Sequence, residues 1–308
     1  MVVARPWRLP RSTEVREVHR GRCGRTVLAR LDGEADAPGD LVAVRYVPAA
    51  LLIHRPRADA FHADLRRLTG LAAPEAVAFR HYVHAPRFAS AYGRWAGAVG
   101  GALVSDAVEG STLALVLEQH GTLPAPAALT VFRRTLRALA AAHDRGLVHG
   151  DVRPGKVLVH SDGTTTLTGL GLAALTTGAA PGLRAPELWR GAVTATPEAD
   201  VYAACCVLHV CLTGELPFTA PQLFTLMARH STAPVPSTAL PEPLHALFAA
   251  GLAKEPALRP PPDVLLTALR RAAGKTLGRH WEERGRATLE TLAAPLVKAL
   301  LPAPGSAR

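Results

Sequence analysis

The stretch from His149 to Val159 constrains the fold of this chain more than any other part. It reads His-Gly-Asp-Val-Arg-Pro-Gly-Lys-Val-Leu-Val, a short polar loop that runs into a β-branched, apolar strand. One histidine, one acid, two bases and a proline lie within eight positions. An amphipathic helical pattern over residues 124–145 precedes the loop and ends at Gly146. The stretch therefore predicts a long helix, a charged loop and a strand in direct succession.

Most of the chain before residue 110 has patterns typical of strands. Three short runs joined by turns predict a small antiparallel sheet. A helical pattern then covers residues 58–71, where Phe61, Leu65 and Leu68 recur at helical spacing, and two more strand-like runs follow. The five strand-like runs are residues 14–19, 26–31, 41–47, 77–83 and 101–105.

Helical patterns dominate after residue 110, with short strands only at 157–159 and 165–168. A last apolar periodicity, over residues 276–301, predicts a helix that packs against the rest of the chain in preference to binding a partner. The helical patterns cover residues 111–120, 124–145, 264–273 and 276–301.

The opening stretch resembles the catalytic loop of protein kinases, in which His-Arg-Asp is followed after four residues by Asn and then by a strand. His149 and Asp151 match this pattern, whereas Gly150 takes the place of the Arg and Lys156 the place of the Asn. The resemblance implies that Asp151 stands where the base accepts the substrate hydroxyl proton. It also implies that Arg153 and Lys156 lie where they can balance phosphate charge.

Further motifs after this loop resemble the carboxyl-terminal lobe of bacterial Hanks-type Ser/Thr protein kinases. Residues 184–187 read Arg-Ala-Pro-Glu, and residues 197–218 resemble the buried central helix of that lobe with its Thr-Gly-Glu-Leu-Pro-Phe turn. The resemblance implies a structural ion pair between Glu187 and Arg259. It also implies that Asp200 binds the backbone of the loop at His149.

The motif that should hold magnesium departs most from the kinase pattern. Gly169-Leu170-Gly171 takes the place of Asp-Phe-Gly, whose Asp holds the metal. No Asp or Glu occurs between Gly163 and Arg184, so no neighbour can substitute. Because magnesium is usually bound through carboxylates and phosphates, Gly169 and Lys156 together predict that magnesium binding is lost.

The phosphate-binding residues of the first lobe are also altered. Val42-Ala43-Val44-Arg45 resembles the Val-Ala-Ile-Lys strand, with Arg45 in place of the Lys, and Asp64 stands near the position of its Glu partner. The alternatives are an exposed arginine at a strand end and a surface carboxylate. Gly21 and Gly24 correspond to the glycine-rich phosphate loop, although an ordinary hairpin turn explains the same two glycines.

Residues 105–110 correspond to the hinge between the kinase lobes. Adenine would bind backbone groups there, so the resemblance places Ser105, Asp106 and Val108 at the nucleotide. Ser105 would be a small gatekeeper residue.

The sequence thus predicts an α+β, bilobal protein-kinase-like fold with a small antiparallel sheet and a mainly helical second lobe. We divide it into an arm (1–12), a first lobe (13–106), a second lobe (107–275) and a helical extension with a tail (276–308). The expected function is that of a pseudokinase, a regulatory or scaffold module for a protein partner such as an active kinase or an assembly. ATP or another nucleotide would bind without metal; the alternative is an active, atypical Ser/Thr kinase with Asp151 as base.

Composition argues against a nucleic-acid or membrane role. The net charge is +10, but only four of the 35 bases are lysine, a bias typical of GC-rich genomes, and no run of five bases occurs. No apolar stretch reaches the roughly 20 residues of a membrane span, and we expect a cytoplasmic protein. The cysteines lack metal-ligand spacing, which favours buried core thiols at positions 23, 205, 206 and 211.

Overall fold

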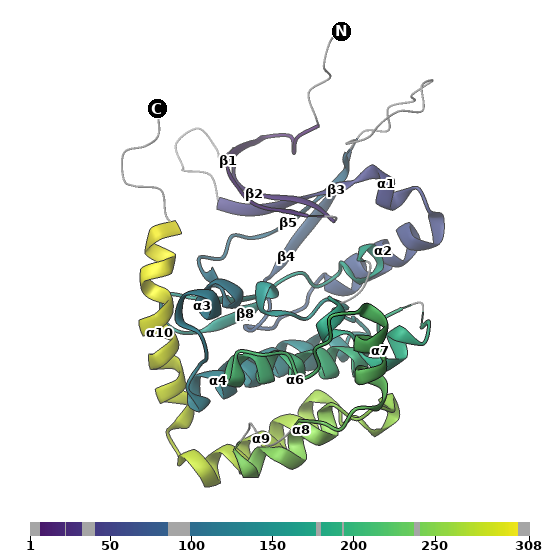
Figure 1. Ribbon diagram of the computed structural model, residues 1–308. Helices are drawn as coiled ribbons and strands as arrows, with labels where there is room; N and C mark the ends of the chain where they lie inside the picture. The colour runs from purple at the N-terminus through teal and green to yellow at the C-terminus, as the bar shows by residue number, and fades with distance from the viewer. Residues whose placement is uncertain are drawn as a thin grey trace. The chain divides into compact units, whose positions relative to one another are not determined.

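A computed structural model of the chain is shown in Figure 1. It describes residues 7–21, 23–32, 41–85, 99–176, 180–192, 194–236 and 241–300. The chain divides into two compact units. The first unit comprises residues 1–72, 77–108 and 174–176, and the second comprises residues 73–76, 109–173 and 177–308. Residues 1–6 of the expected arm and 301–308 of the expected tail lie outside the described residues.

The first unit is built on a five-stranded antiparallel sheet with the order β1-β2-β3-β5-β4. All five strand-like runs of the sequence form strands, so the expected sheet is confirmed. Its strands are β1 (Ser12–Gly21), β2 (Gly24–Leu31), β3 (Leu41–Pro48), β4 (Phe79–His84) and β5 (Val99–Asp106).

One face of this sheet carries an apolar core that includes the residues before β1. Val42, Val44 and Tyr46 alternate along β3 and are buried in this core together with Leu9. The Leu9 amide donates a hydrogen bond to the Tyr46 hydroxyl at 3.1 Å, and the Trp7 ring packs edge-on against the Tyr46 ring. Residues 7–11 form neither helix nor strand, yet these contacts attach them to the sheet.

The helix expected at 58–71 is α2 (Arg55–Leu68), which follows the short α1 (Ala49–Leu52). It begins three residues early because Pro56 occupies the first turn, a favoured place for proline. It ends at Leu68 because Thr69 has extended backbone angles. Phe61, Leu65 and Leu68 are its buried residues, as their spacing predicts.

The second unit is organised around α4 (Ala125–His143), which packs against α6, α9, α10 and β8. Eleven of its residues are buried, because several neighbours cover it. The other helices of the unit are α3 (Leu113–His120), α5 (Pro186–Trp189), α6 (Pro197–Thr213), α7 (Leu223–Thr232), α8 (His245–Gly251), α9 (Pro262–Leu277) and α10 (Trp281–Leu300). The expected α+β architecture, with a small antiparallel sheet and a mainly helical part, is confirmed.

A three-stranded sheet with the order β6-β7-β8 lies in the same unit. β6 (Ser111–Thr112) pairs with β7 (Val157–Val159), which pairs with β8 (Thr165–Leu167), both in antiparallel register. The sequence pattern did not indicate β6, because two residues are too few to show an alternation. The β7–β8 hairpin follows the charged loop and leads directly into Gly169.

Helix α10 crosses α4 and covers the turn between β7 and β8, at the side of the unit shown in yellow in Figure 1. Its intramolecular packing, expected from the sequence, is confirmed. Of the apolar residues that recur at helical spacing in this part of the sequence, Trp281 and Leu289 are buried, whereas Leu292 and Leu296 are half-buried. The buried face also includes Gly285 and Ala293. A Cβ on Gly285 would lie 2.3 Å from the Pro126 carbonyl oxygen, so only glycine allows this close approach.

Three of the four cysteines are buried in α6 as free thiols, in agreement with the sequence expectation. Cys23 is only half-buried, because it lies at the end of the hairpin between β1 and β2, where it bonds the carbonyl oxygen of Leu175. Within the described part of the chain, no helix is both long and apolar enough to cross a membrane.

A buried histidine makes the second unit sensitive to acid. His230 is fully buried, its Nδ1 lies 2.8 Å from the Tyr202 hydroxyl, and burial together with the charge of Lys254 lowers its pKa to about 4. The unfolded chain takes up this proton near pH 6.5, so the stabilisation present above pH 6.5 is lost as the pH falls towards 4. We expect the unfolding free energy of the wild type to fall by about 2 kcal/mol more than that of His230→Gln between pH 7 and 4.5. Urea midpoints that fall by the same amount between pH 7 and 4.5 in the two proteins would contradict this prediction.

Candidate functional site

The loop at His149 is attached to α6 by one buried carboxylate. Asp200 accepts hydrogen bonds from the backbone amides of His149 and Gly150, both at 2.8 Å, and from Nε2 of His143 at 3.0 Å. Asp200 is 2% exposed, so these three donors replace the water that its charge would otherwise require. It lies in the first turn of α6, which begins at the Thr196 cap, and the geometry is the one that the resemblance implied.

Gly150 occupies a backbone conformation that few other residues adopt. Its φ is +71°, and a Cβ at this position would lie 3.2 Å from the Cβ of Ala173. A larger residue would therefore meet both backbone strain and crowding. The loop is shaped for glycine here, where the kinase pattern has arginine.

His149 joins the loop to the end of β8. Its Nδ1 accepts a hydrogen bond from the Asp151 amide at 3.1 Å, so its Nε2 carries the proton and donates to the Thr168 carbonyl at 2.9 Å. Burial lowers the pKa of His149, and the imidazole is neutral. This residue fixes the position of Asp151 relative to the segment that begins at Gly169.

Asp151 is flanked by two cations. Its Oδ2 accepts a hydrogen bond from Nε of Arg153 at 3.1 Å and lies 3.9 Å from Nζ of Lys156. The side chain of Asp151 is mostly shielded from solvent. The carboxylate is thus paired with cationic side chains rather than offered to a metal ion.

Lys156 is buried beside residue 169, where the kinase pattern has a metal-binding aspartate. It is 8% exposed and lies at the end of the 3₁₀ turn Pro154–Lys156, and its carbonyl oxygen accepts from the Thr168 amide at 2.8 Å. A Cβ on Gly169 would lie 3.6 Å from Nζ of Lys156. The ammonium group therefore occupies the space next to residue 169 into which a side chain at that position would extend.

These residues do not fit a magnesium ion. Magnesium needs hard oxygen ligands. With glycine at 169 and lysine at 156, the side chains here are one carboxylate, Asp151, and two cations, Arg153 and Lys156. Across the described residues, no cluster of three or more His, Cys, Asp or Glu side chains could hold a metal. A divalent cation would have to displace the Lys156 ammonium before it could reach Asp151.

The glycines of the first unit have a structural explanation. Gly21 ends β1 and pairs with Gly24, which begins β2, so a connection of only two residues joins the strands. Gly24 has a φ of +103°, and a Cβ there would lie 1.8 Å from the Tyr46 carbonyl oxygen on β3. The close approach of β3 accounts for glycine at position 24, and the binding of phosphate by this hairpin stays a prediction.

Asp64 pairs within its own helix. Its carboxylate accepts from Arg67, three residues later on α2, at 3.1 Å, because residues three apart share a face of a helix. Burial nevertheless raises the pKa of Asp64 above its usual value. Arg45 is half-buried on β3, opposite Thr26 and Leu103 in the sheet. The structure thus shows Asp64 paired with Arg67, and a pair between Arg45 and Asp64 stays a prediction.

The predicted hinge residues lie at the end of β5. Ser105 is half-buried and its hydroxyl donates to the Ala43 carbonyl at 3.5 Å, while Asp106 accepts from Nε of Arg80 at 2.6 Å. Val108 is half-buried at the end of the first unit. Both polar side chains are thus used within the sheet, and adenine binding by the backbone here stays a prediction.

The expected pairing of Glu187 with Arg259 is present in the second unit. Nη1 and Nη2 of Arg259 each donate to one oxygen of Glu187 at 2.7 Å, a bidentate geometry. The same guanidinium also donates to the carbonyl oxygens of Ala253 and Glu198. Its side chain is fully buried, so the pair links the segment after residue 184 to α6 and to the start of α9.

Two residues that position this site were missed by the sequence analysis. Glu75 is buried and pairs with Arg137 of α4 at 3.0 Å, while its carbonyl oxygen accepts from the Leu167 amide of β8. His143 is the third donor to Asp200. Neither lies in a motif, and only the three-dimensional contact reveals their role.

Comparison with known proteins agrees with this geometry. Residues 75–266 match the family described as protein kinase domain. The chain is 37% identical over 164 residues to the serine/threonine-protein kinase PknH of Mycobacterium tuberculosis, which is 48% of this chain and 26% of PknH. It is 36% identical over 168 residues to PknD of the same organism, 49% of this chain and 25% of PknD. The matched region is therefore about a quarter of the length of these curated relatives.

Proposed function

The chain belongs to the protein kinase domain family, and from this premise we propose that it is a pseudokinase. It acts as a regulatory or scaffold module for a protein partner and does not transfer phosphate at an appreciable rate. The observation that carries the proposal is the position of Lys156, whose ammonium lies 3.9 Å from Asp151 and beside Gly169. Residues 156 and 169 stand at the two positions whose side chains bind the metal in the family.

The expected loss of rate follows from the chemistry of phosphoryl transfer. That reaction depends on positioning and on electrostatic stabilisation of the transferring group, with little covalent work for the protein. Removal of one preorganised donor costs roughly 10²–10³ in rate in other enzymes. Loss of the Asp at 169 and of the Asn at 156 should therefore cost several orders of magnitude.

The proposal includes a nucleotide as a ligand, on the chemistry of the second unit alone. Lys156 and Arg153 provide two fixed positive charges that can balance phosphate charge in place of an ion. ATP would then act as an allosteric ligand that stabilises one state of the module. The partner would be a protein in the cytoplasm, which suits four free thiols and bases scattered along the chain.

A double replacement tests the metal argument directly. We expect Lys156→Asn/Gly169→Asp to gain an ATP-induced rise of the thermal midpoint that requires magnesium, because it supplies an amide oxygen and a carboxylate and removes the ammonium. At a nucleotide concentration about 100 times Kd, the gain would be about 2.7 kcal/mol. The matched control Lys275→Asn, an exposed lysine on α9, should gain nothing. An unchanged double variant that remains folded would contradict the assignment of these positions.

The alternative function is an active, atypical Ser/Thr kinase that uses Asp151 as base. It predicts transfer of label from the γ-phosphate of ATP to a protein acceptor, and loss of that transfer in Asp151→Ala. The pseudokinase proposal predicts the same background for both proteins. Transfer by the wild type that disappears in Asp151→Ala would overturn it.

A further inference from the structure

Helix α10 lies beyond the part of the chain that matches the protein kinase family, which ends at residue 266. It packs along α4 and also contacts α3, β6 and β7 of the second unit, on the side shown in yellow in Figure 1. Trp281, Leu289 and Val297 on its inner face are at most 3% exposed. Burial of this extent makes α10 an integral part of the second unit rather than a loose appendage.

Two glycines bring the backbone of α10 into direct contact with its neighbours. A Cβ on Gly285 would lie 2.3 Å from the carbonyl oxygen of Pro126 on α4. Gly163 lies in the turn between β7 and β8, and a Cβ there would lie 2.0 Å from the carbonyl oxygen of Arg286 and 2.8 Å from the amide nitrogen of Glu290. The backbone of α10 is thus packed against α4 and against the turn, with no side chain between them.

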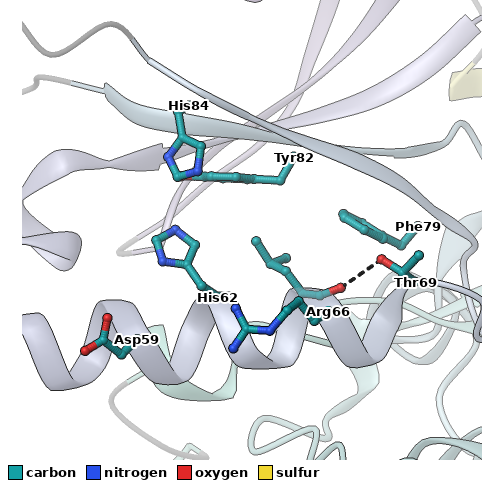
Figure 2. A pocket seen from close by; sticks show the side chains of 8 residues that line it. Asp59, His62, Arg66, Thr69, Phe79, Tyr82 and His84 are labelled. Atoms are coloured by element: carbon teal, nitrogen blue, oxygen red, sulfur yellow. Dashed lines mark hydrogen bonds between the residues drawn. The ribbon is translucent and has the colours of Figure 1, made fainter.

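The packing of α2 in the first unit is of a different kind. α2 faces β4 across a hollow of about 590 Å³, and Figure 2 shows His62 of α2 on one side of it and Phe79 and Tyr82 of β4 on the other. Side chains that line a hollow can rearrange without moving the helix. A close backbone contact has no such freedom, so the position of the β7–β8 turn follows the position of α10.

The hairpin that α10 contacts carries Lys156 at its base. β7 begins at Val157, directly after Lys156, and β8 ends at Leu167, directly before Thr168. The Thr168 amide donates to the Lys156 carbonyl oxygen at 2.8 Å, and the Thr168 carbonyl oxygen accepts from Nε2 of His149 at 2.9 Å. Each strand has only three residues, so the turn and the Lys156 site lie at the two ends of one short hairpin.

A hairpin this short depends on its surroundings, because two paired strands alone are marginally stable in water. β8 has support besides α10, since its Leu167 amide donates to the Glu75 carbonyl oxygen and its Thr165 carbonyl oxygen accepts from Arg134 at 2.9 Å. β7 pairs with the two residues of β6, and α10 packs against both of these strands. Loss of the α10 contact should therefore loosen β7 and the adjoining Lys156 more than β8.

We propose that α10 is a strap that holds the β7–β8 hairpin and thereby fixes Lys156 beside Asp151 and Gly169. Detachment of the strap frees the Lys156 ammonium from the Asp151 carboxylate, 3.9 Å away, without unfolding the rest of the second unit. The site is then opened from the far end of the hairpin and not by a change among its own residues. This role of α10 concerns the mobility of Lys156 and holds whether or not the site binds a nucleotide.

The four lysines of the chain provide the readout. Lys156 is 8% exposed, whereas Lys275 on α9 is exposed and serves as the internal reference. Nζ of Lys254 is buried over the Phe218 ring, 4.0 Å from its centroid, and reports any general loosening of the second unit. Brief acetylation of the folded full chain with acetic anhydride, read by peptide mass spectrometry, gives the rate at each lysine. In the wild type, we expect Lys156 to react at least about tenfold more slowly than Lys275.

Gly163→Ala and Gly285→Ala each place a methyl group where the packing of α10 leaves no room. Both variants should raise the acetylation rate of Lys156 at least about fivefold relative to Lys275, because the strap has to move away from the hairpin or from α4. The rate at Lys254 should stay within about twofold of the wild type, because its surroundings keep their contacts.

Two other glycines provide matched controls in open surroundings. Gly191 also has a positive φ, +99° against +76° at Gly163, but no atom of the described residues lies within 4 Å of a Cβ there. Gly274 lies in helix α9, as Gly285 lies in α10, and its surroundings are equally open. Gly191→Ala and Gly274→Ala should therefore leave the rate at Lys156 within about twofold of the wild type.

Three results would overturn the proposal. The first is an unchanged rate at Lys156 in both Gly163→Ala and Gly285→Ala. The second is an equal rise at Lys156 and Lys254, because the substitutions would then act by general destabilisation of the second unit. The third is a rise at Lys156 in the control variants that matches the rise in Gly163→Ala and Gly285→Ala, because the α10 contact would then have no special effect on the site.

Discussion

Replacing Arg259 by leucine is expected to lower the free energy of unfolding by about 3–5 kcal/mol. The arginine side chain is fully buried and pairs through two hydrogen bonds of 2.7 Å with Glu187, whose side chain is 14% exposed. Its removal leaves the Glu187 carboxylate without a partner in a site that solvent hardly reaches. It also leaves the carbonyl oxygens of Ala253 and Glu198 without their donor.

Arg190→Leu is the matched control for this prediction. Arg190 pairs with Glu255 at 3.3 Å, but both side chains are largely exposed, so this substitution should cost below about 1 kcal/mol. Urea unfolding followed by circular dichroism at pH 7 measures both changes. Equal midpoints for the two variants would show that the buried pair contributes no more than a surface pair.

The second large effect is expected for Asp200→Ala, at about 3–5 kcal/mol. This substitution leaves the amides of His149 and Gly150 buried without an acceptor, and each orphaned donor costs about 1–3 kcal/mol. The third donor, Nε2 of His143, also loses its partner. Besides the loss of stability, we expect the loop that carries Asp151 to exchange its amide hydrogens faster.

Asp162→Ala provides the comparison for that experiment. Asp162 accepts from the amide and hydroxyl of Thr164 in the exposed turn between β7 and β8, so its loss should cost only about 1 kcal/mol. Hydrogen exchange measured by mass spectrometry separates a local loosening of residues 149–153 from global destabilisation. Unchanged protection of that loop in Asp200→Ala would contradict the role assigned to the carboxylate.

The parts of the site that follow local motifs could be predicted from the sequence. Glu187, Arg259 and Asp200 lie in short segments whose spacing is diagnostic, and each makes the contact that the kinase resemblance implied. The family match over residues 75–266 confirms that resemblance. Lys156 was also identified at the metal position, although its approach to Gly169 required the structure.

Contacts between distant segments could not be predicted in the same way. The apolar periodicity of the last helix indicated the correct element and part of its buried face. It did not indicate Gly285, which lets the backbone of α10 approach Pro126. Likewise, the irregularity in β4 that turns Phe79 towards α2 leaves no trace in hydrophobic alternation. The ion pair of Asp64 with Arg67, three positions along its helix, is a local contact that the kinase analogy with Arg45 did not indicate.

The position of Lys156 determines whether stabilisation by ATP should depend on magnesium. If its ammonium takes the place of the ion, any stabilisation by ATP must be independent of magnesium. If the family's metal site survives in some other form, stabilisation must require it. The two cases differ in the magnesium dependence of stabilisation by ATP, which can be measured without a substrate or a partner.

The most direct measurement is therefore the thermal midpoint of the full chain with ATP alone, with ATP and magnesium, and with ATP and a chelator. We predict the same midpoint in all three conditions, whether above that of the protein in buffer or equal to it. A midpoint that rises only with magnesium and falls back with the chelator would contradict the central claim that Lys156 and Gly169 have removed the metal site.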